Sequence, residues 1–368
     1  MQEYRDMMTE IEKQGNLGPV LKQIETAVAG TSREIMEKGK NKKIFFLGCG
    51  DSYFAGLAVK NYFLEKTDSL CFPMTALEFS TYGIRQVDKE STVIAVSMSG
   101  NVARTVEAVK EAQERGAYVV GITNSLTGRL YEVCSHPVFL GLEEEPGWTP
   151  GTLTYTGTLY ALYCLGAGLS RESERDGCKR KLAFTMEQVS RVVTQCQDMA
   201  RQAGENFVYN GHQFPVYILG AGQSFATAKY GAAKFLEVCG VIAIGQESEE
   251  FAHQEFWVID KNCPVFLVAP KGDSFQRTME VGECLRHFGC DLFVISNSEE
   301  LCGMGKYAFG MPEEVGELYA PLLYAVPMQL TAYYFSRKLG LDPDRRSHND
   351  PFRKKVSRML TRGTVNLD

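Results

Sequence analysis

The chain contains the same sequence pattern twice, and this duplication constrains the fold more than any other feature. The first copy, IFFLGCGDSYFAGLAVKNYFLE, spans residues 44–65, and the second copy, VYILGAGQSFATAKYGAAKFLE, spans residues 216–237. Leu47 aligns with Leu219, and every other position of the first copy aligns with its counterpart at this same offset. A repeat of this length predicts two domains of one architecture.

Each copy is typical of a buried strand that turns through glycines into a helix. Residues 44–47 form a short apolar run, Gly48 and Gly50 interrupt it, and Asp51 and Ser52 are expected to cap the following helix. Such a turn directs free backbone N–H groups and the positive end of a helix dipole at one point, which favours an anion such as phosphate. Neither copy has the third glycine and later acidic residue of a dinucleotide-binding fingerprint.

The repeat continues downstream, so each half predicts an α/β unit with a parallel sheet flanked by helices. Residues 93–96 match 265–268 at the same offset, and 116–124 match 289–297 after one inserted residue. We expect an N-terminal helical segment that packs across the first domain, two domains, a helical connector and an irregular, basic C-terminal tail. Their expected ranges are 1–42 for the N-terminal segment, 43–170 and 211–340 for the domains, 171–210 for the connector and 341–368 for the tail.

Composition excludes several classes of protein. The chain has 368 residues and a formal charge of −6, without a basic run that favours nucleic-acid binding. Residues 1–15 lack the apolar core of a signal peptide, and no apolar run approaches the ~18 residues of a membrane span. Eleven cysteines without a C-x-x-C pair predict reduced thiols in a cytoplasmic protein. No motif implies a metal, nucleotide or organic cofactor.

Five motifs, in this order along nearly the whole chain, resemble the SIS (sugar isomerase) family. The resemblance is closest to the two-SIS isomerase module of glucosamine-fructose-6-phosphate aminotransferase and its relatives. The motifs are MMTEIEKQ at 7–14, GCGDSY at 48–53, SMSGNV at 97–102, EFAH at 250–253 and the P-x-x-x-x-x-P-x-Q-L pattern at 321–330. The resemblance implies two tandem SIS domains and a sugar-phosphate ligand.

The resemblance places the phosphate site in the first domain. The contacts that it implies there come from Gly50, Ser52, Ser97 and Ser99, with Thr105 nearby. These serines are equally typical of helix caps and turns, which is the alternative interpretation. Asp51, Met98 and Val102 replace the family's Thr, Gln and Thr. Because a carboxylate repels a phosphate, Asp51 is expected to face a sugar hydroxyl or an amine, and a non-phosphorylated substrate remains open.

Glu237 and His253 match the family's catalytic glutamate and ring-opening histidine in residue type and in their spacing along the chain. Proton transfer between C1 and C2 of an open-chain sugar needs a base aimed at carbon, and an imidazole can shuttle the proton that opens the ring. Glu65 occupies the position of Glu237 in the first copy, so a surface role for Glu237 is the alternative.

Two further residues are candidate substrate contacts. Glu250 matches the glutamate of the family's G-E-L-K-H-G-P loop and could meet a substrate amine, although acidic runs are commonly solvated faces. Lys355, or its neighbour Lys354, is the counterpart that the resemblance implies for the tail lysine that pairs with the open-chain sugar in the aminotransferase, with simple solvent exposure as the alternative.

The resemblance implies an enzyme of sugar-phosphate metabolism, in a homodimer or larger oligomer whose histidine reaches the neighbouring subunit's site. The chain starts at the isomerase module, without the glutaminase domain that supplies ammonia, so we expect a reaction that isomerises the sugar or breaks a carbon–nitrogen bond. Our first hypothesis is a ketosamine 6-phosphate (fructosamine-type) deglycase that releases an amine and a hexose 6-phosphate. The alternatives are an amino-sugar-phosphate deaminase/isomerase and, in another class, a non-catalytic sugar-phosphate sensor.

Overall fold

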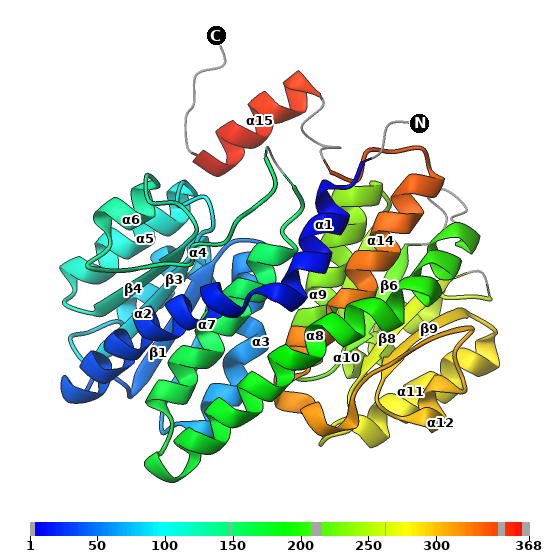
Figure 1. The fold of residues 1–368 in the computed structure, drawn as a ribbon, viewed down its shortest axis with the longest axis horizontal. Coiled ribbons are helices and arrows are strands. Elements are labelled where there is room, and N and C mark those ends of the chain that lie inside the picture. The colour runs from blue at the N-terminus through cyan, green and yellow to red at the C-terminus, as the bar shows by residue number, and fades with distance from the viewer. Residues whose placement is uncertain (1–3, 147–148, 208–214, 262, 345–349, 363–368) are drawn as a thin grey trace. The chain divides into compact units, whose positions relative to one another are not determined.

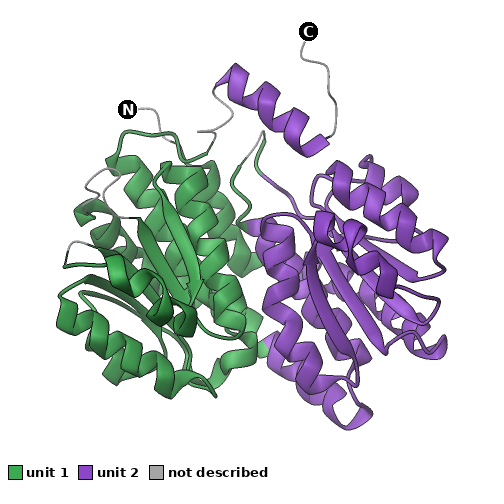
Figure 2. Cartoon of the chain, turned by 180° about the vertical axis from the view of Figure 1, so that it is seen from behind, with its two compact units in different colours: residues 1–16, 145–152, 184–347 green, residues 17–144, 153–183, 348–368 purple. Residues whose placement is uncertain are grey.

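The computed structural model describes residues 4–146, 149–207, 215–261, 263–344 and 350–362. The chain forms two compact units (Figure 2). Unit 2 contains residues 17–144, 153–183 and 348–368, and so holds the first copy of the repeat. Unit 1 contains residues 1–16, 145–152 and 184–347 with the second copy. The structure thus confirms two α/β halves.

Unit 2 is built around a five-stranded parallel sheet of order β2-β1-β3-β4-β5 (Figure 1). Its strands are β1 (Lys43–Gly48), β2 (Leu70–Thr75), β3 (Ser91–Val96), β4 (Tyr118–Thr123) and β5 (His136–Phe139). Its helices are α2 (Gly18–Glu37), α3 (Asp51–Lys66), α4 (Ala76–Thr81), α5 (Ala103–Glu114), α6 (Arg129–Val133), α7 (Leu153–Leu169), the first part of α8 (Glu172–Asn206), and α15 (Pro351–Arg362), with a short 3-10 turn, Gly83–Gln86.

Unit 1 has a second five-stranded parallel sheet, of order β7-β6-β8-β9-β10. Its strands are β6 (Val216–Gly220), β7 (Ala243–Glu247), β8 (Pro264–Ala269), β9 (Asp291–Ser296) and β10 (Tyr307–Gly310). Its helices are α1 (Asp6–Lys13), the second part of α8, α9 (Gln223–Lys234), α10 (Ser248–His253), α11 (Phe275–Phe288), α12 (Glu299–Cys302), α13 (Pro321–Tyr324) and α14 (Val326–Lys338). Short helical turns are Gln14–Asn16, Phe235–Cys239, Glu255–Val258, Glu313–Val315 and Glu317–Tyr319.

The two sheets share strand order and register. Leu47 pairs with Ala95 in unit 2, and their counterparts in the repeat, Leu219 and Leu267, pair with each other in unit 1. Both sheets reverse their winding direction between the first and third strands of the unit. This strand order is the flavodoxin-like doubly wound arrangement, whose ligand crevice lies at that reversal.

Continuous apolar runs explain why these strands are central. Every residue of β3, β4 and β8 is buried, as expected for parallel strands covered by helices on both faces. Helix α7 is apolar on all sides, and all its residues except Cys164 and Gly168 are buried against neighbours that include α2 and α3. The eleven cysteines are free thiols, and only Cys49 and Cys284 are exposed.

The structure corrects two expectations at the chain ends. Helix α2 packs on α7 in the unit of the first copy, as expected for the N-terminal segment, whereas α1 packs on α14 in the unit of the second copy, where Asp344 accepts a hydrogen bond from the Met7 amide at 2.9 Å. The tail is not wholly irregular, because residues 351–362 form α15. Residues 208–210 of the expected connector, 211–214 and 262 of the expected second domain, and 345–349 and 363–368 of the tail lie outside the described residues.

One local expectation was also wrong. Helix α3 begins at Asp51, so its N-cap is Gly50, and Asp51 and Ser52 lie in the first helical turn instead of at the cap position. The P-x-x-x-x-x-P-x-Q-L pattern forms two helices, α13 and α14, which are divided at Ala325 because Pro327 occupies the first turn of the second helix and lacks an N–H donor. Along the described residues, we find no helix that combines the length and apolarity needed to cross a membrane.

Candidate active site

The strand order of unit 2 brings the predicted phosphate contacts to one edge of its sheet. Strands β1 and β3 are neighbours, and the winding direction reverses between them. Residues 48–52 follow β1 and residues 97–102 follow β3 at the carboxyl edge, where ligands of doubly wound sheets bind. We call these two loops, together with Thr105 in the first turn of α5, the unit 2 cradle.

The first cradle loop is shaped by its glycines. Gly50 has a φ of +56°, a conformation that side chains rarely adopt. A Cβ atom at Gly48 would lie 2.7 Å from the Cβ of Ser52, so glycine there lets the first turn of α3 approach β1. Ser52 and Asp51 are both half-buried in that turn. The loop therefore presents the N-terminus of α3 at close range.

The second cradle loop is fixed by backbone hydrogen bonds. The Gly100 amide donates to the Ser97 carbonyl at 2.9 Å, and Gly100 has a φ of +65°. The carbonyl of Met98 accepts from the Thr123 hydroxyl at 3.1 Å and from the Asn124 amide at 3.0 Å. These contacts hold the serine positions in place without using the serine hydroxyls.

Two hydroxyls of the cradle are buried without a hydrogen-bond partner among the described residues. The Ser97 side chain is 2% exposed and Thr105 is fully buried, and neither Oγ atom is paired. A buried, unpaired hydroxyl costs free energy, so native proteins rarely leave one unsatisfied. The hydrogen-bonding capacity of the two hydroxyls is therefore not used by the described residues.

Ser99 and Arg129 lie at the exposed rim of the cradle. The Ser99 hydroxyl accepts from the Asn101 amide at 3.3 Å, and Asn101 in turn donates its side-chain amide to the Ser99 carbonyl at 2.7 Å. The Arg129 guanidinium donates to the Asn101 carbonyl at 2.9 Å. Arg129 thus brings a cation to the rim, and no motif in the sequence marks it.

Glu237 lies in unit 1, in a turn of π-helix (Phe235–Cys239) that extends α9. Its carboxylate accepts from the Lys234 ammonium at 2.6 Å, and the side chains of Lys234 and Glu237 are 1% and 27% exposed. The Lys234 ammonium also lies 5.1 Å from the centre of the Tyr230 ring. A buried cation therefore lies beside Glu237, and the sequence already places this lysine one helical turn before the glutamate.

His253 is at the end of α10, and its side chain is 69% exposed. Its Nε2 lies 3.1 Å from Glu249 Oε1, and Glu249 also accepts from the Arg277 guanidinium. The hydrogen bond from Arg277, and then that with His253, lowers the pKa of Glu249. Glu249 thus orients the imidazole, a role that the sequence motif assigns to no residue.

Glu250 is exposed on the same short helix. Its side chain accepts from Gln254 Nε2 at 2.8 Å, and its backbone amide donates to the Glu247 side chain, which caps α10. The acidic run therefore has distinct local tasks, with Glu247 capping the helix and Glu249 binding Arg277 and His253.

Within unit 1, Glu237 and His253 lie at opposite ends of β7. Because β7 runs parallel to β6, α9 and its π-helical turn return to the amino edge of the sheet before β7 begins. Helix α10, which ends at His253, starts at the carboxyl edge after β7, and a five-residue strand is about 17 Å long. The fold of this unit does not bring the two side chains together.

Lys355 is exposed on α15, which belongs to unit 2 and contacts α5. The Arg129 guanidinium reaches the carbonyl of Arg362 on α15 at 3.5 Å. The tail helix therefore lies beside the helix that starts at the cradle.

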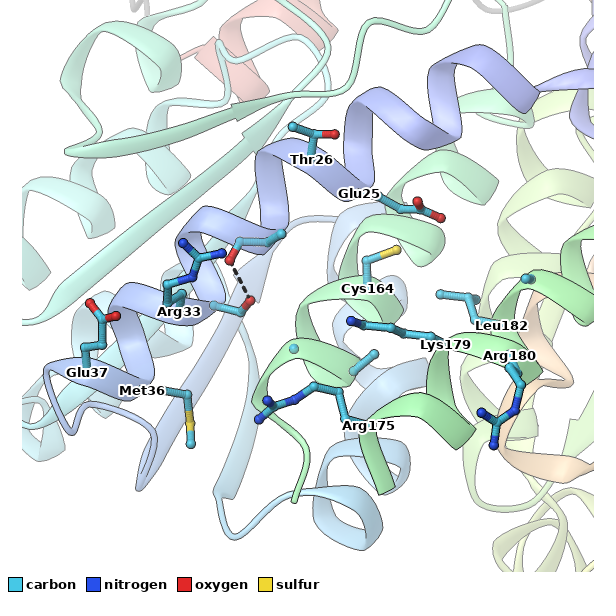
Figure 3. Close-up of a pocket in the computed structure, with 15 residues that line it drawn as sticks. Glu25, Thr26, Arg33, Met36, Glu37, Cys164, Arg175, Lys179, Arg180 and Leu182 are labelled. Carbon is cyan, nitrogen blue, oxygen red and sulfur yellow. Dashed lines mark hydrogen bonds between the residues drawn. The ribbon is translucent and has the colours of Figure 1, made fainter. Parts of the chain in front are cut away.

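A separate cavity of about 740 Å³ lies between α2, α7 and the first turns of α8 in unit 2 (Figure 3). Figure 3 shows Glu25 and Arg33 on α2, and Arg175 and Lys179 on α8, around this space. None of the predicted site residues lines it. No cluster of three or more His, Cys, Asp or Glu side chains suited to a metal ion occurs among the residues that the structure describes.

Comparison with known proteins finds one domain family in both halves of the chain. The SIS domain model matches residues 39–166 and again residues 213–336. Glutamine–fructose-6-phosphate aminotransferase (isomerizing) from Thermococcus kodakarensis is 28% identical over 318 residues, which are 85% of this chain and 52% of that protein. The enzyme of that name from Aquifex aeolicus is 28% identical over 305 residues, 82% of this chain and 50% of that protein. The chain spans about half the length of the curated relatives it matches.

Two solved structures show the same fold. The C-terminal domain of glucosamine-fructose-6-phosphate aminotransferase from Francisella tularensis superposes with a TM-score of 0.77 at 21% identity, covering 94% of this chain and 98% of that one. Tagatose-6-phosphate ketose/aldose isomerase from Escherichia coli gives a TM-score of 0.68 at 17% identity, with 92% of each chain covered. With a family match to most of both units and the same sheet order in each, the chain belongs to the SIS domain family as a tandem pair of SIS domains.

Proposed function

We propose that the chain is a sugar-phosphate enzyme, and specifically a ketosamine 6-phosphate deglycase that releases an amine and a hexose 6-phosphate. The observation that carries the first part is the pair of buried, unpaired hydroxyls of Ser97 and Thr105 at the switch point of unit 2. A phosphate offers three acceptor oxygens and could satisfy both hydroxyls as well as the backbone amides at the start of α3. The positive end of that 16-residue helix favours the same charge.

Asp51 supports the second part of the proposal, an amine in the substrate. It stands in the first turn of α3, where a carboxylate is favoured by the helix dipole and sits next to the turn at Gly50. Its carboxylate charge favours a cation, such as a substrate amine, on its side of the cradle. A ketosamine 6-phosphate carries both a phosphate and an amine, and so matches Ser97 and Asp51 together.

We assign the proton transfers to Glu237 and His253. His253 protonates the ring oxygen as the ring opens, and Glu237 moves a proton between C1 and C2 of the open chain. Water then adds to the resulting imine, which expels the amine and leaves the hexose 6-phosphate. Glu250 and Lys355 remain proposed contacts to the amine and to the open-chain sugar.

The proposed site is completed by a second subunit. Its support is the separation of Glu237 from His253 by the length of β7 within unit 1. Since Glu237 and the helix that carries His253 start from opposite edges of the sheet, we assign His253 to the site of a neighbouring copy in a homodimer or larger assembly.

The test is an incubation of the protein with ketosamine 6-phosphates, glucosamine 6-phosphate and their unphosphorylated counterparts. Hexose 6-phosphate together with the intact amine supports the deglycase. Release of ammonia from glucosamine 6-phosphate instead supports the amino-sugar-phosphate deaminase/isomerase, which also suits Asp51. Turnover of the unphosphorylated compounds at equal rates contradicts a phosphate cradle.

A sugar-phosphate sensor uses the same cradle, so turnover must separate the two classes. For an enzyme, E237Q abolishes turnover while phosphosugar binding to the unit 2 cradle persists. For a sensor, the wild-type chain binds the phosphosugar without converting it.

A further inference from the structure

The second copy of the repeat contains the same glycine turn as the first, but a side chain of the chain itself fills it. Gly222, the counterpart of Gly50, has the same φ of +56° and precedes α9 as its N-cap. We call residues 220–224 and 269–274 the unit 1 cradle. It lies at the carboxyl edge of β6 and β8, the reversal point of that sheet.

The carboxylate of Glu317 occupies this cradle. Its Oε1 accepts from the side-chain amide of Gln223 at 2.8 Å, and its Oε2 accepts from the backbone amide of Asp273 at 2.6 Å. Gln223 is 2% exposed, so this side-chain donor is buried. One donor comes from each loop of the cradle, as expected for a bound anion.

Gly272 provides the space for this carboxylate. A Cβ atom at this position would lie 1.2 Å from Glu317 Oε2, and Gly272 is not among the glycines with positive φ. Steric room for Glu317, and not a backbone conformation, therefore requires glycine there. Gly316, with a φ of +75°, turns the chain immediately before Glu317.

The two cradles also differ in their hydroxyl groups, which are unpaired in unit 2 but are missing or paired in unit 1. Ser97, unpaired in unit 2, is replaced by Ala269 at the equivalent position of unit 1. Thr105 is unpaired, whereas its counterpart Thr278 donates to the Ser274 carbonyl at 3.0 Å. The unit 2 cradle is left with unused donors, and the unit 1 cradle has an internal acceptor.

We propose that Glu317 is a built-in occupant of a second anion site, which an external phosphate or other small oxyanion can enter once the carboxylate is removed. The chain then has one cradle that is open to a ligand, in unit 2, and one latent cradle that Glu317 fills, in unit 1. This proposal concerns unit 1 alone and does not depend on the reaction proposed above.

The test compares E317A with the wild type by calorimetric titration of inorganic phosphate into the full chain. The matched control is E313A: Glu313 lies in the same segment and its carboxylate pairs with the cradle residue Lys271 at 2.8 Å, whereas the donors Gln223 and the Asp273 amide bond to Glu317. We expect E317A to bind one phosphate more per chain than the wild type, and E313A to bind the same number as the wild type. If all three proteins bind the same number of phosphates per chain, the proposal is overturned, whether or not the unit 2 cradle binds one.

The loss of a carboxylate that satisfies two donors can also destabilise unit 1. E317A is therefore prepared and melted with and without phosphate. A yield or Tm that phosphate restores in E317A, but leaves unchanged in E313A, supports the latent site. If E317A does not fold either with or without phosphate, the proposal is contradicted, since an external anion then cannot replace the carboxylate.

Discussion

The ammonium nitrogen of Lys234 lies 2.6 Å from the carboxylate of Glu237, and the lysine side chain is 1% exposed where the glutamate is 27% exposed. The proposed base therefore also neutralises a buried cation. Its removal affects the stability of unit 1 as well as proton transfer.

We expect E237Q to lower the free energy of unfolding by about 2 kcal/mol, less than a fully buried pair because Glu237 is partly exposed. The double variant K234M/E237Q should recover most of this loss, because it removes the buried charge as well. Urea unfolding of both variants measures the effect. An E237Q variant as stable as the wild type would show that the pair contributes no stability.

Substitution of the unpaired cradle hydroxyls should weaken phosphate binding without weakening the fold. We expect S97A and T105V each to lower the affinity for inorganic phosphate about tenfold, the effect of one hydrogen bond to a charged group. Stability should stay unchanged or rise, because each change removes an unsatisfied group. S91A is the matched control: Ser91 is buried at the start of β3, and its hydroxyl bonds to Asp88, so this change should cost stability and spare the affinity.

Cys49 offers a direct reporter of the cradle. It is exposed in the turn between Gly48 and Gly50, while Cys284 is exposed on α11 in the other unit. A thiol reagent should modify these two cysteines first. Phosphosugar at saturation should slow the reaction of Cys49 and leave that of Cys284 unchanged, as mass mapping of the labelled peptides can measure. Protection of both cysteines, or of neither, would argue against a ligand at the turn.

If His253 acts in the site of a neighbouring subunit, two inactive variants with different substitutions should restore each other's activity in mixed oligomers. We expect H253A to lower kcat about 100-fold, as loss of a general acid typically does. H287A is its control, since His287 is exposed in the same unit and bonds to the Glu283 carbonyl. Mixed oligomers of H253A and E237Q chains should regain activity that neither variant has alone, because one site then combines the Glu237 of one chain with the His253 of the other. Mixtures without recovery would place His253 in the site of its own chain.

Asp88 should make unit 2 sensitive to acid. The hydrogen bond from Lys43, and then that from Ser91, lowers the pKa of Asp88 from 3.8 to about 2. Because the depressed pKa belongs to the folded state, its contribution to stability is complete above about pH 4 and is lost as the pH falls toward about 2. K43M should flatten the stability profile across this window in thermal melts, and an unchanged profile would contradict the pairing.

The sequence predicted those parts of the fold that repeat locally. Leu47 and Leu219, which align in the repeat, also occupy equivalent positions in the strand pairing, because the hydrophobic period, the turns and the strand register are set within each unit. The motif at 97–102 located the cradle loop but could not show that the Ser97 hydroxyl is unpaired, since that depends on which side chains converge on it.

Contacts across long stretches of chain were beyond prediction. Glu317 reaches Gln223 over 94 residues, and no local pattern links the two. The sheet topology likewise starts the segments of Glu237 and His253 at opposite edges of the sheet, although only β7 and α10 lie between the two residues in the sequence. Spacing along a chain gives residue types and order, whereas parallel strands decide which end of the sheet each residue reaches.

The equal φ of +56° at Gly50 and Gly222 has a practical consequence for protein engineering. Since the two turns share one backbone, the halves differ in recognition through a handful of side chains that can be exchanged without redesigning the scaffold. Introducing a carboxylate beside the first turn, or deleting the one beside the second, would set the ligand capacity of a single polypeptide to none, one or two.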